Sequence, residues 1–154
     1  MKPIIIPPAE GNAVSAFGDT IVFKLVGSQT GQGITIGRCT TAPGGGPPLH
    51  IHQREDEIFI IESGDIEVST GENVWQKVAP GSVVYLPKGH QHQFRNAGDT
   101  PAHFWLIASP SGFEDFYERC SAIFNAGGPP DFGKILQVAG EHGMQIVGPP
   151  PGAH

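Results

Sequence analysis

Evenly spaced turns are the feature that most limits what this chain can fold into. From Gly64 to Gly98, glycines recur every seven to ten residues, with short apolar segments between them. Short segments rich in Val, Ile and aromatic residues, separated by turns, are typical of strands in an antiparallel sandwich or barrel. The sequence therefore predicts an all-β fold. The expected strands are residues 20–26, 33–41, 57–62, 66–69, 74–78, 83–86, 92–95 and 102–108, and residues 1–19 are expected to be irregular.

Composition agrees with one small domain of short strands. The chain has 154 residues, of which 22 are Gly and 15 are Pro, and only 16% are charged. The formal net charge of −6 provides no basic surface, so we expect no nucleic-acid partner. No apolar run is long enough for a membrane span, and the three isoleucines near the N-terminus are too few for a signal-peptide core. We therefore expect a cytosolic (cytoplasmic) protein with Cys39 and Cys120 reduced and buried.

A pair of histidines begins the most informative stretch of the chain. His50 and His52 are two residues apart, so on a strand both side chains point to the same face. Glu57 would face the opposite way if that strand continued unbroken. The polar segment at residues 53–56 therefore predicts a turn, with Glu57 facing the histidines from the next strand. In this interpretation Glu55 and Asp56 lie in the turn and are solvated.

His92 follows a Pro-Lys-Gly turn and would begin a further strand that approaches the same point. Three imidazoles and a carboxylate that converge inside a barrel form a metal site with nitrogen and oxygen ligands. The predicted ligands are His50, His52, Glu57 and His92, and the predicted cofactor is one divalent transition metal. The pattern leaves Fe, Mn, Ni, Zn and Cu open. His90 lies next to the motif, and we expect it at the pocket mouth or in solvent.

Both segments carry a recognisable spacing. They read G-x5-H-x-H-x4-E-x6-G from Gly44 to Gly64 and G-x5-P-x-G-x2-H-x3-N from Gly81 to Asn96. With every fixed position filled, the chain resembles the cupin family. The resemblance implies a jelly-roll barrel (a double-stranded β-helix) at about residues 20–109. The motif pair occurs once, so we expect one cupin domain over residues 1–154.

After Pro110 the apolar residues change to helical spacing. The pattern predicts a C-terminal helical segment at about residues 111–143, followed by a tail at residues 148–154. Ser111 and Glu114 are expected to form a capping box at the first helix, and Asp131 is expected to cap the second. The Phe-Glu-x-Phe segment and the closing Gly-Pro-Pro also resemble small cupins of the quercetin 2,3-dioxygenase type. Expected apolar faces are Phe113, Phe116, Tyr117, Cys120, Ile123 and Phe124 in the first helix, and Phe132, Ile135, Leu136 and Ala139 in the second.

Three of the predicted strands are apolar on both faces, namely residues 58–61, 83–86 and 104–107. An antiparallel strand with one face in water should instead alternate. We therefore expect both the C-terminal helices and a second subunit to cover the outer face. This interpretation predicts a homodimer.

Strand parity also predicts the wall of the metal pocket. Phe59 and Ile61 share the face of Glu57, and Phe94 shares the face of His92. Such a pocket is apolar apart from the metal and suits a small aromatic or enolic substrate.

Three classes of function fit these features. The first is a dioxygenase resembling the quercetin dioxygenases, in which Glu57 is both ligand and catalytic base because no other carboxylate is placed inside the barrel. The second is a non-redox isomerase, lyase or hydrolase that uses the metal as a Lewis acid. The third is a non-catalytic cupin that binds a small ligand.

Overall fold

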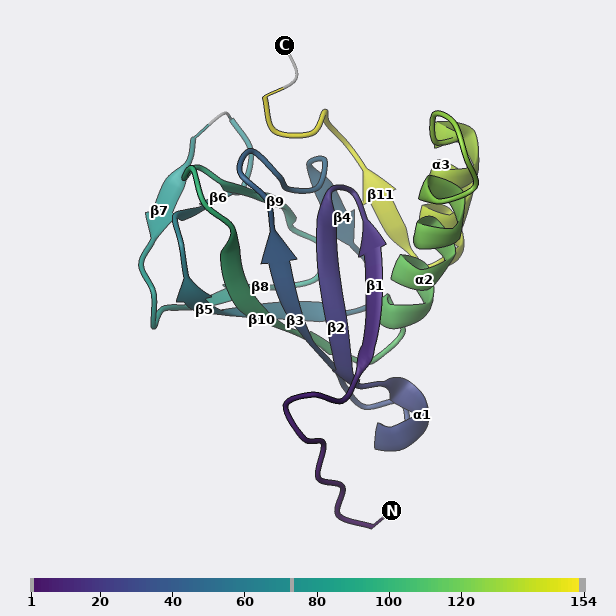
Figure 1. Ribbon diagram of the computed structural model, residues 1–154. Coiled ribbons are helices and arrows are strands. Elements are labelled where there is room, and N and C mark those ends of the chain that lie inside the picture. The colour runs from purple at the N-terminus through teal and green to yellow at the C-terminus, as the bar shows by residue number, and fades with distance from the viewer. Residues whose placement is uncertain (1, 73, 153–154) are drawn as a thin grey trace.

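Two antiparallel sheets face each other in a computed structural model that describes residues 2–72 and 74–152 (Figure 1). Met1, Asn73 and residues 153–154 lie outside the described residues, so the expected tail is described only to residue 152. The larger sheet has the order β1 (Asn12–Ala16), β2 (Asp19–Leu25), β3 (Thr35–Thr41), β10 (Ala102–Ser109), β5 (Asp56–Ser63) and β8 (Val83–Leu86). The smaller sheet has the order β11 (Met144–Ile146), β4 (His50–His52), β9 (Gln91–Asn96), β6 (Ile66–Ser69) and β7 (Gln76–Val78).

The predicted all-β class and jelly-roll architecture are confirmed. Each predicted strand is present: residues 66–69 and 83–86 have the predicted bounds, and the other strands have shifted ends. The expectation that residues 1–19 are irregular is wrong in part, because β1 lies within this range and pairs with β2; residues 2–11 contain no helix or strand, as expected. Residues 27–30 form a short helix, α1 (Gly27–Thr30), in place of an expected loop. Strand β11 was not predicted, and its three residues are too few to show a period.

The core lies between the sheets. Along β2 and β3 the buried and partly exposed positions alternate, as expected for strands with one inward face. Phe59, Phe94 and Phe104 come from three strands, and their ring centroids lie 4.7–5.6 Å apart. Both cysteines are free and buried, as predicted.

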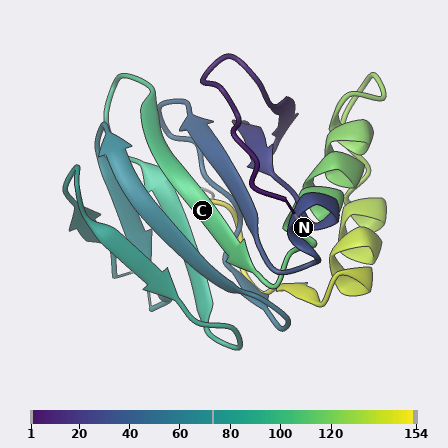
Figure 2. The ribbon, with the colours of Figure 1, turned by 90° about the horizontal axis from the view of Figure 1, so that it is seen from below.

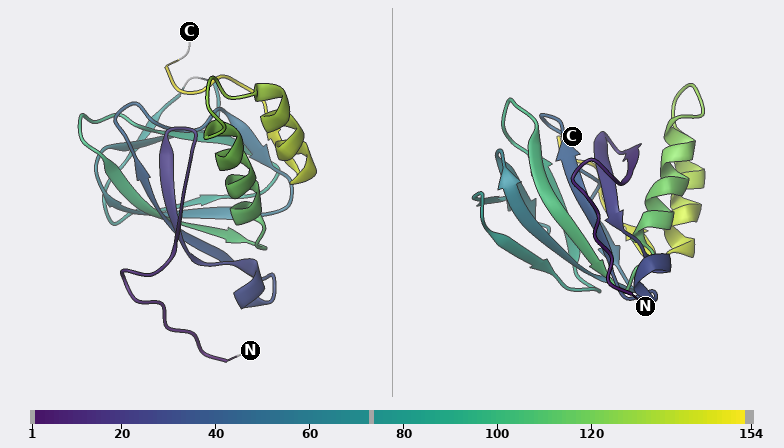
Figure 3. Two further views of the ribbon diagram at one scale, coloured as in Figure 1. Left: turned by 45° about the vertical axis from the view of Figure 1, so that its right-hand side comes forward. Right: turned by 60° about the horizontal axis from the view of Figure 1, so that its bottom comes forward.

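Helices α2 (Phe113–Phe124) and α3 (Phe132–Glu141) lie together along one side of the barrel, beside β1 and β11 (Figures 2 and 3). The predicted apolar stripe of α2 faces the barrel, with four of its residues buried. The predicted capping box is wrong: Gly112 is the N-cap, and the Ser111 hydroxyl donates to the side chain of Gln32. The Glu114 carboxylate accepts instead from the backbone N–H of Gly27 and of Gly112.

Helix α3 begins as predicted, because the Asp131 side chain accepts from the backbone N–H of Lys134. Its predicted apolar face is wrong in part. Phe132 and Leu136 are 65% and 55% exposed, whereas Val138 is buried beside Ile135 and Ala139. Residues 130–141 carry apolar side chains on more than one side, so spacing alone did not identify the face that packs.

The helices do not cover the outer face of the strands that are apolar on both sides. Ile60, Val83 and Tyr85 are exposed on β5 and β8, at the edge of the large sheet away from β1. The N-terminal arm lies over another part of this sheet, where Lys24 Nζ donates to the carbonyl oxygen of Pro8 at 2.7 Å. No helix in the described part of the chain has both the length and the apolarity needed to cross a bilayer.

Candidate metal centre

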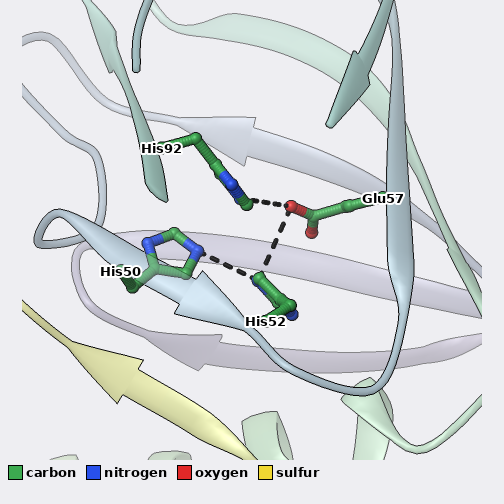
Figure 4. Close-up of side chains that lie close together, drawn as sticks. All are labelled: His50, His52, Glu57 and His92. Atoms are coloured by element: carbon green, nitrogen blue, oxygen red, sulfur yellow. Dashed lines mark hydrogen bonds and ion pairs between the residues drawn. The ribbon is translucent and has the colours of Figure 1, made fainter. Parts of the chain in front are cut away.

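Three strands bring the four predicted ligands together inside the barrel (Figure 4). His50 and His52 come from β4, and His92 comes from the neighbouring β9, where it pairs with His50 in the strand register. Glu57 comes from β5 in the opposite sheet, after the turn that the sequence predicts. All four side chains are buried, and one ligand atom from each lies within 4.8 Å of the others.

Hydrogen bonds set the same tautomer on all three imidazoles. Each Nδ1 faces an oxygen that can only accept: the Pro48 carbonyl for His50 at 2.8 Å, the Glu55 carboxylate for His52 at 2.7 Å, and the His90 carbonyl for His92 at 3.2 Å. In the neutral form of each ring, Nδ1 therefore carries the proton, which leaves an Nε2 lone pair.

The three lone pairs and the carboxylate point at one another. His50 Nε2 lies 3.0 Å from His52 Nε2, and Glu57 Oε2 lies 3.1 Å from His92 Nε2. Four acceptors at these distances repel unless a cation lies between them. Because the donors are imidazole nitrogens and one carboxylate oxygen, they fit a divalent transition metal. His50, His52, Glu57 and His92 would hold it.

Burial and mutual charge set the protonation of the centre, and a metal must displace any proton held at His52 Nε2. Burial, together with the neighbouring His92 and His52, lowers the pKa of His50 to about 3, so this imidazole is neutral at pH 7. Burial opposes ionisation of Glu57, but the facing histidines outweigh it and lower its pKa. Burial likewise opposes the charged form of His52, but Glu57 and Glu55 outweigh it and raise its pKa.

Glu55 is a functional residue that the sequence interpretation missed. It was expected to be solvated in the turn, but it is only 6% exposed and accepts from His52 Nδ1. Ligand histidines commonly donate their second N–H to a carboxylate, which fixes the ring and strengthens the ligand. Glu55 follows His52 by three residues within a turn, and this spacing could have indicated a contact between the two side chains. Asp56 also differs from the prediction: it begins β5, is half-buried, and accepts from the backbone N–H of Lys88.

A small cavity of about 40 Å³ adjoins the centre, with His50 and Glu57 in its wall. Phe59 and Phe94 line it, as the parity argument predicts. Ile61 is buried but is not in the wall, because it lies farther along β5. A single water needs roughly 10–15 Å³ by this measure, so the cavity fits a ligand of only a few non-hydrogen atoms. His90 is exposed, as predicted.

A carboxyl group that the sequence interpretation did not place inside also lines this cavity. Asp19 at the start of β2 is 4% exposed. The statement that Glu57 is the only carboxylate inside the barrel is therefore wrong. The predicted strand began one residue later, so Asp19 was counted with the irregular arm.

Comparisons with known proteins agree with the motifs. Residues 37–108 match the cupin domain family. Among curated proteins, germin-like protein 5-1 from Oryza sativa subsp. japonica is 34% identical over 61% of this chain and 46% of its own length. Germin-like protein 1-1 from the same organism is 33% identical over 84% of this chain and 62% of its own length. The chain thus spans about half the length of the curated relatives it matches.

Solved structures show the same fold. KdgF from Halomonas sp. superposes with a TM-score of 0.62 at 16% identity, over 73% of this chain and 99% of its own. A predicted oxalate decarboxylase from Thermotoga maritima superposes with a TM-score of 0.61 at 20% identity, over 70% of this chain and 99% of its own. By the sequence match over residues 37–108, the signature motifs and the fold, this protein contains a cupin domain.

Proposed function

We propose that the protein is a metal-dependent oxidoreductase of the dioxygenase type that acts on a small enolic substrate. The observation that carries this proposal is the set of three Nε2 lone pairs and one carboxylate, all buried and directed at one point beside an apolar cavity. Four protein ligands leave one or two positions of a five- or six-coordinate metal for substrate and dioxygen.

Each group of residues around the centre would have its own role in the reaction. Glu55 and the carbonyl oxygens of Pro48 and His90 hold the three imidazoles in the ligating tautomer. Phe59 and Phe94 exclude water from the reacting groups. Glu57 is ionised at neutral pH and is placed to accept the proton of an enolic hydroxyl. When bound, a redox-active divalent metal would supply Lewis acidity toward the substrate oxygen and electron transfer to dioxygen.

The cavity volume narrows the substrate class that the sequence suggested. A flavonol has far more atoms than a cavity of about 40 Å³ accepts without movement of the aromatic wall. The proposed substrates are therefore small enols and enolisable ketones. Of the aromatic substrates that the sequence suggested, only those with a single ring remain.

The test combines metal analysis with oxygen consumption. Wild-type protein should contain about one metal per chain, and protein reloaded with Fe, Mn, Ni or Cu should consume oxygen with a small enol such as acetylacetone, faster than with quercetin. His92→Ala should lose most of the metal and the activity, because a ligand is removed. His90→Ala, a matched change two residues away and in solvent, should keep both.

Two results would contradict the proposal in different ways. A wild-type protein without bound metal would contradict the metal site itself. Stoichiometric metal with no oxygen uptake on any enol of a broad panel would exclude the dioxygenase and favour non-redox Lewis-acid chemistry at the same ligands.

A further inference from the structure

Asp19 is the one charged residue of β2 whose side chain faces the barrel interior. The buried positions of this strand are Asp19, Ile21 and Phe23, which alternate with partly exposed ones. Asp19 therefore shares the inward face with two core side chains, and it is 4% exposed. A carboxyl group at such a position is rare unless it is paired.

The fold fixes the position of Asp19 through its backbone. Ala16 pairs with Asp19 across a two-residue hairpin turn, in which Phe17 and Gly18 have φ values of 55° and 83°. Turns of this kind match the twist of the strands they join. The Tyr117 hydroxyl of α2 lies 2.7 Å from the Ala16 carbonyl oxygen, to which it donates, and 3.2 Å from that of Asp19.

One oxygen of the carboxyl group has no hydrogen bond of normal geometry. Asp19 Oδ1 is buried without a hydrogen bond to any part of the chain that the structure describes, and so is Oγ1 of Thr41, its cross-strand neighbour. The backbone of Gly45 lies over both, since a Cβ at Gly45 would be 3.2 Å from Asp19 Oδ1. Burial raises the pKa of Asp19 to about 7, and the Thr41 hydroxyl opposes part of that rise. An unpaired buried polar atom costs stability and calls for an explanation.

The explanation lies in the cavity that Asp19 shares with the metal centre. Its wall is mostly apolar, with two small polar regions, formed by His50 and Glu57 of the centre and by Asp19. The rings of Phe59, Phe94 and other apolar side chains form most of the rest. A small ligand with two oxygen functions satisfies both polar regions, whereas a ligand with one leaves Asp19 unpaired.

We propose that Asp19 binds a hydroxyl group of the substrate while another substrate oxygen faces the metal centre at His50 and Glu57. The ligand class is small hydroxylated acids and hydroxyketones. This inference rests on the proposed function, because it uses the same cavity. A hydroxyl group suits Asp19 in either protonation state, since it donates to a carboxylate and accepts from a carboxylic acid.

The test measures ligand binding and does not depend on turnover. Zn(II)-loaded protein is titrated by calorimetry with two matched ligand pairs, acetate with glycolate and propionate with 3-hydroxypropionate, whose members differ by one hydroxyl group. Wild-type protein should bind the hydroxylated member of at least one pair about tenfold more tightly, the effect of one hydrogen bond to a charged group. Asp19→Leu, which has similar branching without polar atoms, should lose this preference and keep its affinity for acetate and propionate.

Two further variants separate binding from a structural role. Asp19→Asn retains hydrogen-bonding atoms at the same place and should keep most of the preference. Asp99→Asn changes an exposed aspartate and should match wild type throughout. The inference is overturned if Asp19→Leu keeps the preference, if it weakens both members of each pair equally, or if wild-type protein with full zinc shows no preference. Failure of the wild-type protein to retain zinc would instead overturn the proposed function, and with it this inference.

Discussion

At the scale of single residues, the metal centre depends on atoms that do not touch the metal. The proton on each Nδ1 is fixed by an oxygen acceptor, so Nε2 is the atom of each imidazole that faces the metal position. Two of these acceptors are backbone carbonyls, which no side-chain substitution removes. The third, Glu55, is a side chain and is therefore open to mutation.

We predict that Glu55→Ala weakens metal binding by about 10- to 100-fold, because His52 then loses the group that orients it. Glu55→Gln should weaken it less, since the amide oxygen can still accept from Nδ1–H. Competition with a chromophoric chelator measures both affinities. Glu10→Gln, an exposed glutamate far from the site, is the control. Equal affinities in all four proteins would show that Glu55 does not position His52.

We also predict that Asp19 makes the protein less stable as the pH rises. Its pKa is 3.8 in the unfolded chain and about 7 when folded. Between these values the folded state binds more protons than the unfolded state, so this group destabilises the fold progressively from about pH 4 to pH 8. The Asp19→Asn variant has no carboxyl group to titrate. Its free energy of unfolding, relative to that of wild type, should therefore rise over this pH range by at most ~4 kcal/mol.

Urea unfolding at pH 5 and pH 8 measures this difference. The nearby Cys39 and Tyr117 stay neutral, because burial first, and then Asp19, raises the pKa of each. His50 and Glu57 line the same cavity and are present in both proteins, so their contribution largely cancels. The control Asp99→Asn should differ from wild type by the same free energy of unfolding at both pH values. The same result for Asp19→Asn would contradict the prediction.

At the scale of elements, short strand β11 connects the C-terminal helices to the metal centre. It pairs with β4, where Ile146 lies opposite His50 and Met144 lies opposite His52. β11 thus covers the edge of the strand that supplies two ligands. Met144 is buried, whereas Gln145 between these positions is exposed.

We predict that Met144→Ala lowers the free energy of unfolding by about 2–5 kcal/mol, the usual cost of a truncated buried side chain. Because Met144 packs beside the strand β4 that carries two ligands, the metal affinity should also fall in this variant. Gln145→Ala should change the free energy of unfolding by less than about 0.5 kcal/mol. Urea denaturation with and without metal compares the two variants, and similar effects would show that β11 contributes little packing.

At the scale of the whole molecule, the outer face of the large sheet carries an apolar patch that the rest of the described chain leaves open. The patch consists of Ile60, Val83 and Tyr85, which are 38%, 66% and 59% exposed. β8 is also the edge of its sheet. Apolar patches on sheet edges tend to be covered by another chain. We propose that a second copy covers this one.

We predict a homodimer of about twice 16.3 kDa, and Val83→Lys should shift it to the monomer because the charge would be buried in the interface. Sedimentation at micromolar concentration measures the mass. Val147→Lys changes an exposed valine that follows β11, on the other sheet, and it should leave the dimer intact. A wild-type protein that sediments as a monomer would refute the prediction.

The sequence by itself determined the features that depend on local spacing. The two-residue step from His50 to His52 and the turn before Glu57 placed three ligands on facing strands, and alternation along β5 and β9 directed Phe59 and Phe94 inward. Local spacing suffices in these cases because strand geometry fixes the face of each side chain within a few residues.

Tertiary structure decided what surrounds those side chains. Whether Glu55 is solvated, whether Asp19 faces the cavity, and which side of α3 packs all depend on segments distant in the sequence, such as α2 and the Gly45 loop. Alternation along a strand predicts which face a side chain is on, but not which element covers that face. Burial therefore follows only from the packed fold, and the charge state of Asp19 follows from its burial. The cavity volume is likewise a product of packing, because side chains from several strands must meet before any space between them is defined.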